Sequence, residues 1–179
     1  MNEEQYSRAN KRVLLAIVVV FGYIAATLML ALVVSQGGHA SKIMMEAVTA
    51  AAVIVISVAA YLGKRTTRTC AVIMTLSMMI GYFVIVQLNT TVGTWTYGLP
   101  LLIAAMVYLD KKIVMMTNGI ALVAIIVHLV RCFLGGGSDL RNNVIGLFVL
   151  LLTAYACNSA ERLLERFFKE NLADRKSVV

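Results

Sequence analysis

The stretch that decides the fold is VLLAIVVVFGYIAATLMLALVV, residues 13–34, which contains no charged side chain. A helix needs roughly 20 apolar residues to cross the ~30 Å hydrocarbon core of a bilayer, so this stretch can form a membrane span. Five further apolar stretches, separated by short polar turns, complete an expected set of six spans at residues 44–62, 71–88, 95–109, 113–133 and 143–157. The sequence therefore predicts an all-α, polytopic membrane protein with six transmembrane helices.

The fourth of these stretches is short and contains Gly98 and Pro100. We expect this span to begin either at Trp95 or earlier, near Val92, with Pro100 in or near its first turn. A missing backbone N–H costs least in the first turn of a helix.

The composition agrees with a membrane bundle. The chain of 179 residues is 60% hydrophobic and only 14% charged, with a mean hydropathy of +0.85. A soluble domain normally carries about 25% charged residues. Six spans with short loops use nearly the whole chain. We therefore expect a transmembrane bundle over residues 1–158 and an amphipathic cytoplasmic helix over residues 159–179.

The basic residues predict the orientation of the spans. Of the 16 lysines and arginines, all but Lys42, Arg131 and Arg141 fall in the termini and in alternate connections. Because Lys and Arg accumulate on the cytoplasmic side, both termini are expected in the cytoplasm. The net charge of +7 is then explained by topology and by contact with anionic lipid. We expect the lipid bilayer, and no nucleic acid, as a partner.

The sequence gives little sign of an enzyme. Cys70, Cys132 and Cys157 lie in three different spans without a Cys-x-x-Cys pattern, so we expect no metal site and no disulfide framework. No Walker loop, Gly-x-Ser-x-Gly elbow or His-Glu-x-x-His motif is present. We predict no catalytic residue, no cofactor and no enzymatic activity. The pair His128 and Cys132, four residues apart, supports only a minor alternative, an enzyme that acts within the membrane.

Three ionisable side chains near the outer ends of the spans are candidates for ligand binding. Glu46 lies about one turn inside the second span, where a carboxylate is costly and often functional, although it would also complement the helix dipole. His128 and Arg131 are three residues apart and share a face of the fifth helix. This pair could bind an anion, could pair with Glu46 or Asp139, or could place Arg131 among lipid headgroups.

Three further residues complete the candidate ligand site. Trp95 and Tyr97 lie at the outer boundary, close in sequence to the polar residue Asn89. Aromatic side chains gather at membrane interfaces because they are amphipathic, and this alone could explain them. If an outward pocket exists, these aromatic and amide side chains are suitable lining for a small molecule.

The C-terminal stretch NSAERLLERFFKENLADRKSVV, residues 158–179, is amphipathic and contains neither Gly nor Pro. Leu164, Phe168 and Leu172 form one apolar stripe, so we expect the sixth span to continue as a rigid signalling helix. This helix could lie flat on the membrane or begin a parallel dimeric coiled coil, and we favour the coiled coil. Because the sequence stops within a helical pattern, we also expect a longer protein with an output module beyond Val179.

The start MNEEQYSRANKR, the short-looped spans and the final NSAERLLERFFKENL helix resemble the membrane region of bacterial methyl-accepting chemotaxis proteins. The chain departs from that family because it shows no HAMP linker, no large extracytoplasmic ligand domain and no methylated signalling hairpin. The resemblance implies a sensory input domain in the cytoplasmic membrane of a bacterium, which dimerises through its C-terminal helix. It also implies a small-molecule ligand and cytoplasmic signalling proteins as partners. The alternative is a small membrane transporter or the substrate-binding subunit of a vitamin importer.

Overall fold

The computed structural model describes residues 3–34, 40–88, 93–135 and 140–177, and every regular element in these ranges is helical. In chain order the elements are α1 (Glu3–Val34), α2 (Ala40–Lys64), α3 (Arg68–Leu88), the 3₁₀ turn η1 (Thr94–Tyr97), α4 (Gly98–Met106), α5 (Lys111–Leu134) and α6 (Leu140–Ser177). Five of them, α1, α2, α3, α5 and α6, are long and apolar enough to cross a membrane. The all-helical, membrane-type fold expected from the sequence is therefore confirmed.

The fourth expected span is built differently from the others. It consists of η1 followed by α4, which together form one shorter apolar segment, Thr94–Met106. Pro100 is the third residue of α4, as expected from the low cost of a proline in the first helical turn. Val92, the earlier of the two expected starts of this span, lies outside the described residues.

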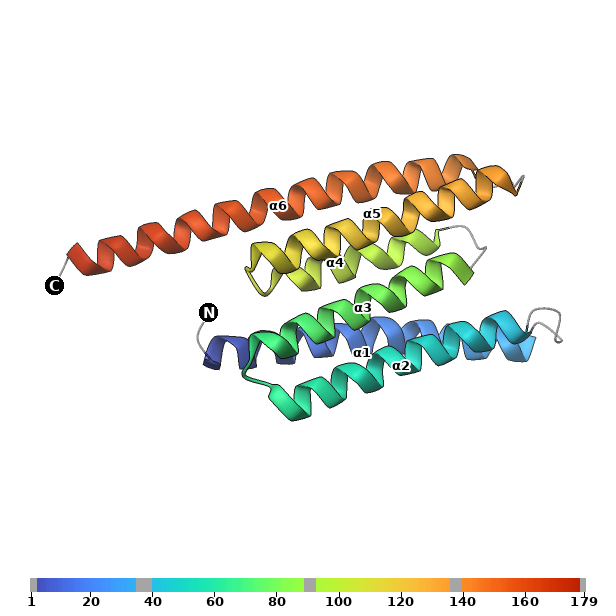
Figure 1. Cartoon of the computed structure of the whole chain (residues 1–179), viewed down its shortest axis with the longest axis horizontal. Coiled ribbons are helices and arrows are strands. Elements are labelled where there is room, and N and C mark those ends of the chain that lie inside the picture. The colour runs from blue at the N-terminus through green and yellow to red at the C-terminus, as the bar shows by residue number, and fades with distance from the viewer. Residues whose placement is uncertain (1–2, 35–39, 89–92, 136–139, 178–179) are drawn as a thin grey trace.

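Successive helices alternate in direction, so the start of α1 and the end of α6 lie at the same end of the bundle (Figure 1). We call this the basic end, because it also holds the α2–α3 and α4–α5 connections with Lys64, Arg65, Lys111 and Lys112. The far end holds the start of α2, the ends of α3 and α5, and the start of α6. At the basic end α6 projects well beyond the other helices (Figure 1).

The core forms around α3, which contacts α1, α2, α4 and α5. Apolar side chains that recur every three or four residues give α1 its buried stripe: Val13, Ile17, Phe21, Ile24 and Leu28. The outward faces of the helices are also apolar, with Leu30 66% and Val33 82% exposed. Soluble monomers rarely expose large continuous apolar surfaces, whereas a lipid-facing surface requires them.

Small residues allow the helices to approach closely beside the core. At Gly81 of α3 a Cβ atom would overlap Val53 Cγ2 of α2 and would lie 3.2 Å from Phe21 Cε1 of α1. The hydroxyls of Ser57 and Ser77 are 3.1 Å apart and join α2 to α3. Close packing and hydroxyl contacts of this kind drive helix association where no hydrophobic effect operates.

Candidate functional site

At the far end, Arg131 of α5 reaches the last turn of α3. Its Nη1 donates to the backbone carbonyl of Gln87 over 2.8 Å and lies 3.4 Å from the Gln87 side-chain oxygen. The Gln87 amide in turn donates to the Ala124 carbonyl of α5 over 2.9 Å. The His128 ring lies within electrostatic range of the Val86 carbonyl, also in the last turn of α3. His128 and Arg131 therefore lie on one face of α5, as expected, and that face contacts the end of α3.

These contacts satisfy backbone carbonyls at the C-terminus of α3. The last four carbonyls of a helix have no partner within the helix, and an unsatisfied carbonyl is expensive where water is scarce. A cation at a helix C-terminus also interacts favourably with the helix dipole. His128 and Arg131 thus cap α3 from a neighbouring helix. The anion-binding role expected of the pair stays a prediction.

Glu46 and Tyr97 form a second group at the far end. Glu46 is almost fully buried although it lies only two turns into α2. It interacts electrostatically with Lys42, one turn earlier on α2, and lies within electrostatic range of Tyr97 in η1. Tyr23 of α1 also lies within range of Tyr97. Two of the expected ligand-binding residues therefore lie within electrostatic range of each other, on helices distant in sequence.

Trp95 packs within the bundle. A Cβ atom at Gly146 of α6 would lie 2.7 Å from the Trp95 indole, so the ring occupies the space that the glycine leaves open. The Tyr82 hydroxyl of α3 donates to the Trp95 carbonyl over 3.2 Å. The indole N–H is buried without a hydrogen-bond partner. Trp95 therefore joins η1 to α3 and α6, which accounts for an aromatic residue here without a ligand.

The remaining expected residues fall in different places. Asn89 and Asp139 lie outside the described residues. Leu164 lies on the exposed part of α6, and the side chains of Phe168 and Leu172 are outside the described set, so their contacts stay predictions. Among the described residues, no three His, Cys, Asp or Glu side chains are grouped to hold a metal ion.

Two polar contacts hold α6 to α5, one near each end of the membrane-spanning part. Near the basic end, the Asn118 amide lies 3.3 Å from both the Ala154 carbonyl and the Asn158 side-chain oxygen of α6. Near the far end, Asn143 of α6 donates to Cys132 Sγ over 3.3 Å. Sequence reasoning did not single out Asn143, because an asparagine in a first helical turn is an ordinary cap or loop residue.

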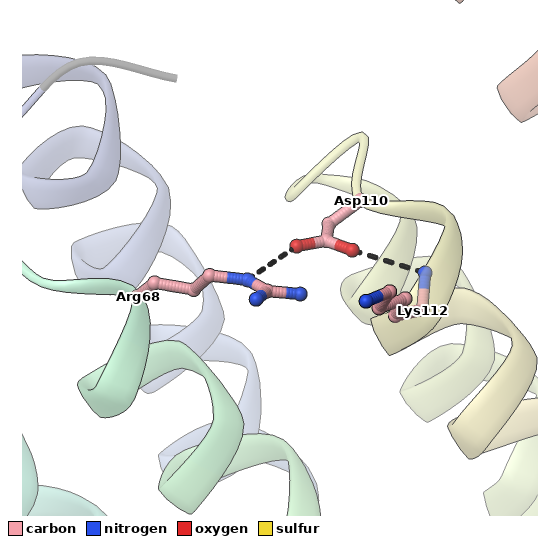
Figure 2. A network of polar contacts seen from close by, with 3 residues as sticks. All are labelled: Arg68, Asp110 and Lys112. Atoms are coloured by element: carbon pink, nitrogen blue, oxygen red, sulfur yellow. Dashed lines mark hydrogen bonds and ion pairs between the residues drawn. The ribbon is translucent and has the colours of Figure 1, made fainter.

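A network of polar contacts around Asp110 joins α3 to the start of α5 at the basic end (Figure 2). Asp110, which precedes α5, accepts from the Lys112 backbone N–H over 3.0 Å as an N-cap and pairs with Arg68 Nε of α3 at 2.8 Å. Nearby, the buried Asn10 of α1 donates to the Arg65 carbonyl of the α2–α3 turn over 2.8 Å. The start of α1 and two connections are thus held together where α6 leaves the bundle.

Asp110 gives a pH-dependent prediction. Partial burial raises its pKa, but the hydrogen bonds from Arg68 and the Lys112 backbone outweigh it and hold the pKa below the ordinary 3.8. A carboxyl whose pKa is lowered on folding stabilises the protein above its unfolded pKa and loses that contribution as the pH falls through the folded value. At pH 7, Asp110→Ala should cost about 1 kcal/mol through the lost cap. Asp110→Asn, which can still cap, should cost less.

The measurement is the free energy of unfolding in mixed micelles at pH 7 and at pH values below 3.8. The difference between wild type and Asp110→Asn should shrink as the pH falls. A difference that is constant with pH would show that the Asp110 charge contributes nothing to stability.

A groove of about 580 Å³ opens at the basic end and contains none of the expected ligand-binding residues. Its lining combines the cations Arg8, Lys11 and Arg12 with the apolar residues Leu14, Leu15 and Val18, and with Tyr61 of α2. Cations beside apolar side chains match the boundary between headgroups and acyl chains. This part of α1 is therefore suited to the membrane interface.

Comparison of the chain with models of known protein families, with curated proteins and with solved structures found no match.

Proposed function

We propose that this chain is the membrane-embedded sensory input domain of a bacterial signal transducer. In this proposal it crosses the cytoplasmic membrane six times, with the basic end in the cytoplasm. The excess of Lys and Arg at that end supports this orientation. The short η1–α4 segment serves as the fourth span, because its contacts with α1, α3, α5 and α6 shield it from lipid.

The observation that carries the proposal is the length of α6. It runs without interruption for 38 residues, Leu140–Ser177, or about 57 Å at 1.5 Å per residue. The hydrocarbon core accounts for only ~30 Å of this length. One rigid element therefore connects the far end to a point well beyond the bundle. A small shift of α6 at the far end would move its cytoplasmic end.

The contacts that hold α6 are suited to a switch. The Asn118 amide lies 3.3 Å from both of its acceptors on α6, which is long for an N–H···O bond. Asn143 of α6 donates to the sulfur of Cys132, which is a weak acceptor. Such interhelical bonds average about 0.6 kcal/mol in membranes. For signalling, α6 must have a second packing that lies only a few kcal/mol away, and weak polar contacts with α5 favour such an arrangement. We further propose that the output resembles that of chemotaxis receptors and that the exposed stripe containing Leu164 mediates dimerisation.

The test joins the chain in helical register to the cytoplasmic signalling hairpin of a chemoreceptor and measures kinase output. Arg131→Ala uncaps α3 at the far end and should change the output about fivefold, the equivalent of ~1 kcal/mol of coupling. The paired substitutions Ser159→Gly and Ala160→Gly should abolish this change, because glycines weaken the helix between bundle and output.

Ser159→Ala is the matched control, since it leaves the helix intact and should preserve the response to Arg131→Ala. The proposal fails if the glycine pair leaves the response unchanged, or if no far-end substitution alters the output.

A further inference from the structure

Cys132 differs from the other two cysteines in its surroundings. Cys70 and Cys157 are buried, 0% and 3% exposed, among apolar side chains of the core. Cys132 is half-buried in the last turns of α5 and has polar neighbours on two helices. Reactive thiols are usually partly exposed and lie beside a basic group such as a histidine.

Among the described residues, His128 and Asn143 place polar side-chain atoms next to the Cys132 sulfur. His128 Nε2, one turn earlier on α5, lies 3.6 Å from Sγ. The Asn143 amide of α6, itself only 5% exposed, donates to the same atom over 3.3 Å. The nearby Val86 carbonyl favours a ring N–H directed at it. We infer that Nδ1 carries this proton, which leaves the Nε2 lone pair facing the thiol.

We propose that Cys132 is an activated thiol that forms covalent adducts with soft carbon electrophiles, in particular α,β-unsaturated carbonyl compounds. Nε2 of His128 takes the thiol proton, while the Asn143 N–H stabilises the charge that develops on sulfur. Sγ attacks the β-carbon, a C–S bond forms, and the π electrons of the C=C bond move to give an enolate. The imidazolium returns the proton to the α-carbon. The product is a thioether, and no oxidant is consumed.

The site is placed to influence α6. Asn143 lies in the first turn of α6, so an adduct on Cys132 must displace or reorient the side chain that joins α6 to α5 at the far end. Modification would thereby act as a stimulus. This last step rests on the proposed sensory function, whereas the chemistry of the thiol does not.

The chemistry is tested on the full chain in lipid nanodiscs with N-ethylmaleimide, with modification followed by mass spectrometry at each cysteine. Cys132 should react, and His128→Gln should slow this reaction at least tenfold at pH 7, in line with the loss of a general base. Glutamine retains an N–H donor for the Val86 carbonyl but provides no base. Continued protection of Cys70 and Cys157 shows that the variant is folded.

Asn143→Ala provides an independent variant on the other helix and should slow the reaction about threefold to tenfold. The proposal is overturned if folded wild-type protein does not react at Cys132, or if both variants react at the wild-type rate, as a merely accessible cysteine would.

The link to signalling is tested separately in the chemoreceptor chimera. N-ethylmaleimide should change kinase output in the wild-type chimera and not in the Cys132→Ser variant. Rapid modification without a change in output would support the activated thiol but contradict its role as a stimulus sensor.

Discussion

Gly81→Ala is expected to destabilise the bundle by about 2 kcal/mol, although alanine is normally the better residue within a helix. The added methyl group would overlap Val53 Cγ2 and press on the Phe21 ring. Valine in a helix has one strongly preferred rotamer, so Val53 cannot turn aside at low cost. The helices must separate locally instead, and packing around α3 is lost. The measurement is the free energy of unfolding from detergent titration in mixed micelles, followed by circular dichroism.

Gly119→Ala is the matched control, because a Cβ atom at this position of α5 meets no heavy atom within 4 Å. This variant should be neutral or more stable by up to about 1 kcal/mol. In the double variant Val53→Ala with Gly81→Ala the overlapping methyl is removed. Its free energy of unfolding should therefore be at least 1 kcal/mol higher than the value obtained by adding the two single effects. Equal effects of Gly81→Ala and Gly119→Ala would disprove this account of the packing.

Trp95→Ala is expected to cost a net of about 2 kcal/mol. Loss of a packed Trp ring from the surface over Gly146 costs about 3 kcal/mol. The substitution also removes an indole N–H that is buried without a partner, which stabilises the variant by about 1 kcal/mol. Trp95→Phe keeps an aromatic ring and removes the unpaired donor, so it should stay within about 1 kcal/mol of wild type. The same detergent titration measures these variants.

Tyr155→Ala is the control for a lipid-facing aromatic residue, since Tyr155 is 74% exposed on α6. It should change stability by less than about 0.5 kcal/mol. If Trp95→Ala behaves like Tyr155→Ala, Trp95 acts as an interfacial anchor or ligand contact rather than as a packing residue.

The sequence predicted which residues lie at the far end better than it predicted which of them contact one another. His128 and Arg131 were expected on one face, because helical geometry places residues three apart together. No pattern in the sequence reveals that this face meets the end of α3, with Val86 and Gln87 as its partners. The pairing of Asp110 with Arg68 was likewise not predicted, since nothing in the sequence indicates that these two residues, 42 positions apart, lie close together.

The sequence by itself determined that the chain is helical, that its helices suit a membrane, and that α6 continues into a polar extension. These properties follow from apolar length and residue propensity, which act locally along the chain. Only the tertiary structure decided which far-end side chains meet. It placed Glu46 within electrostatic range of Tyr97, Arg131 on the Gln87 carbonyl, and Asn143 on Cys132. Contacts between helices depend on how side chains interdigitate in three dimensions, and hydropathy does not record that.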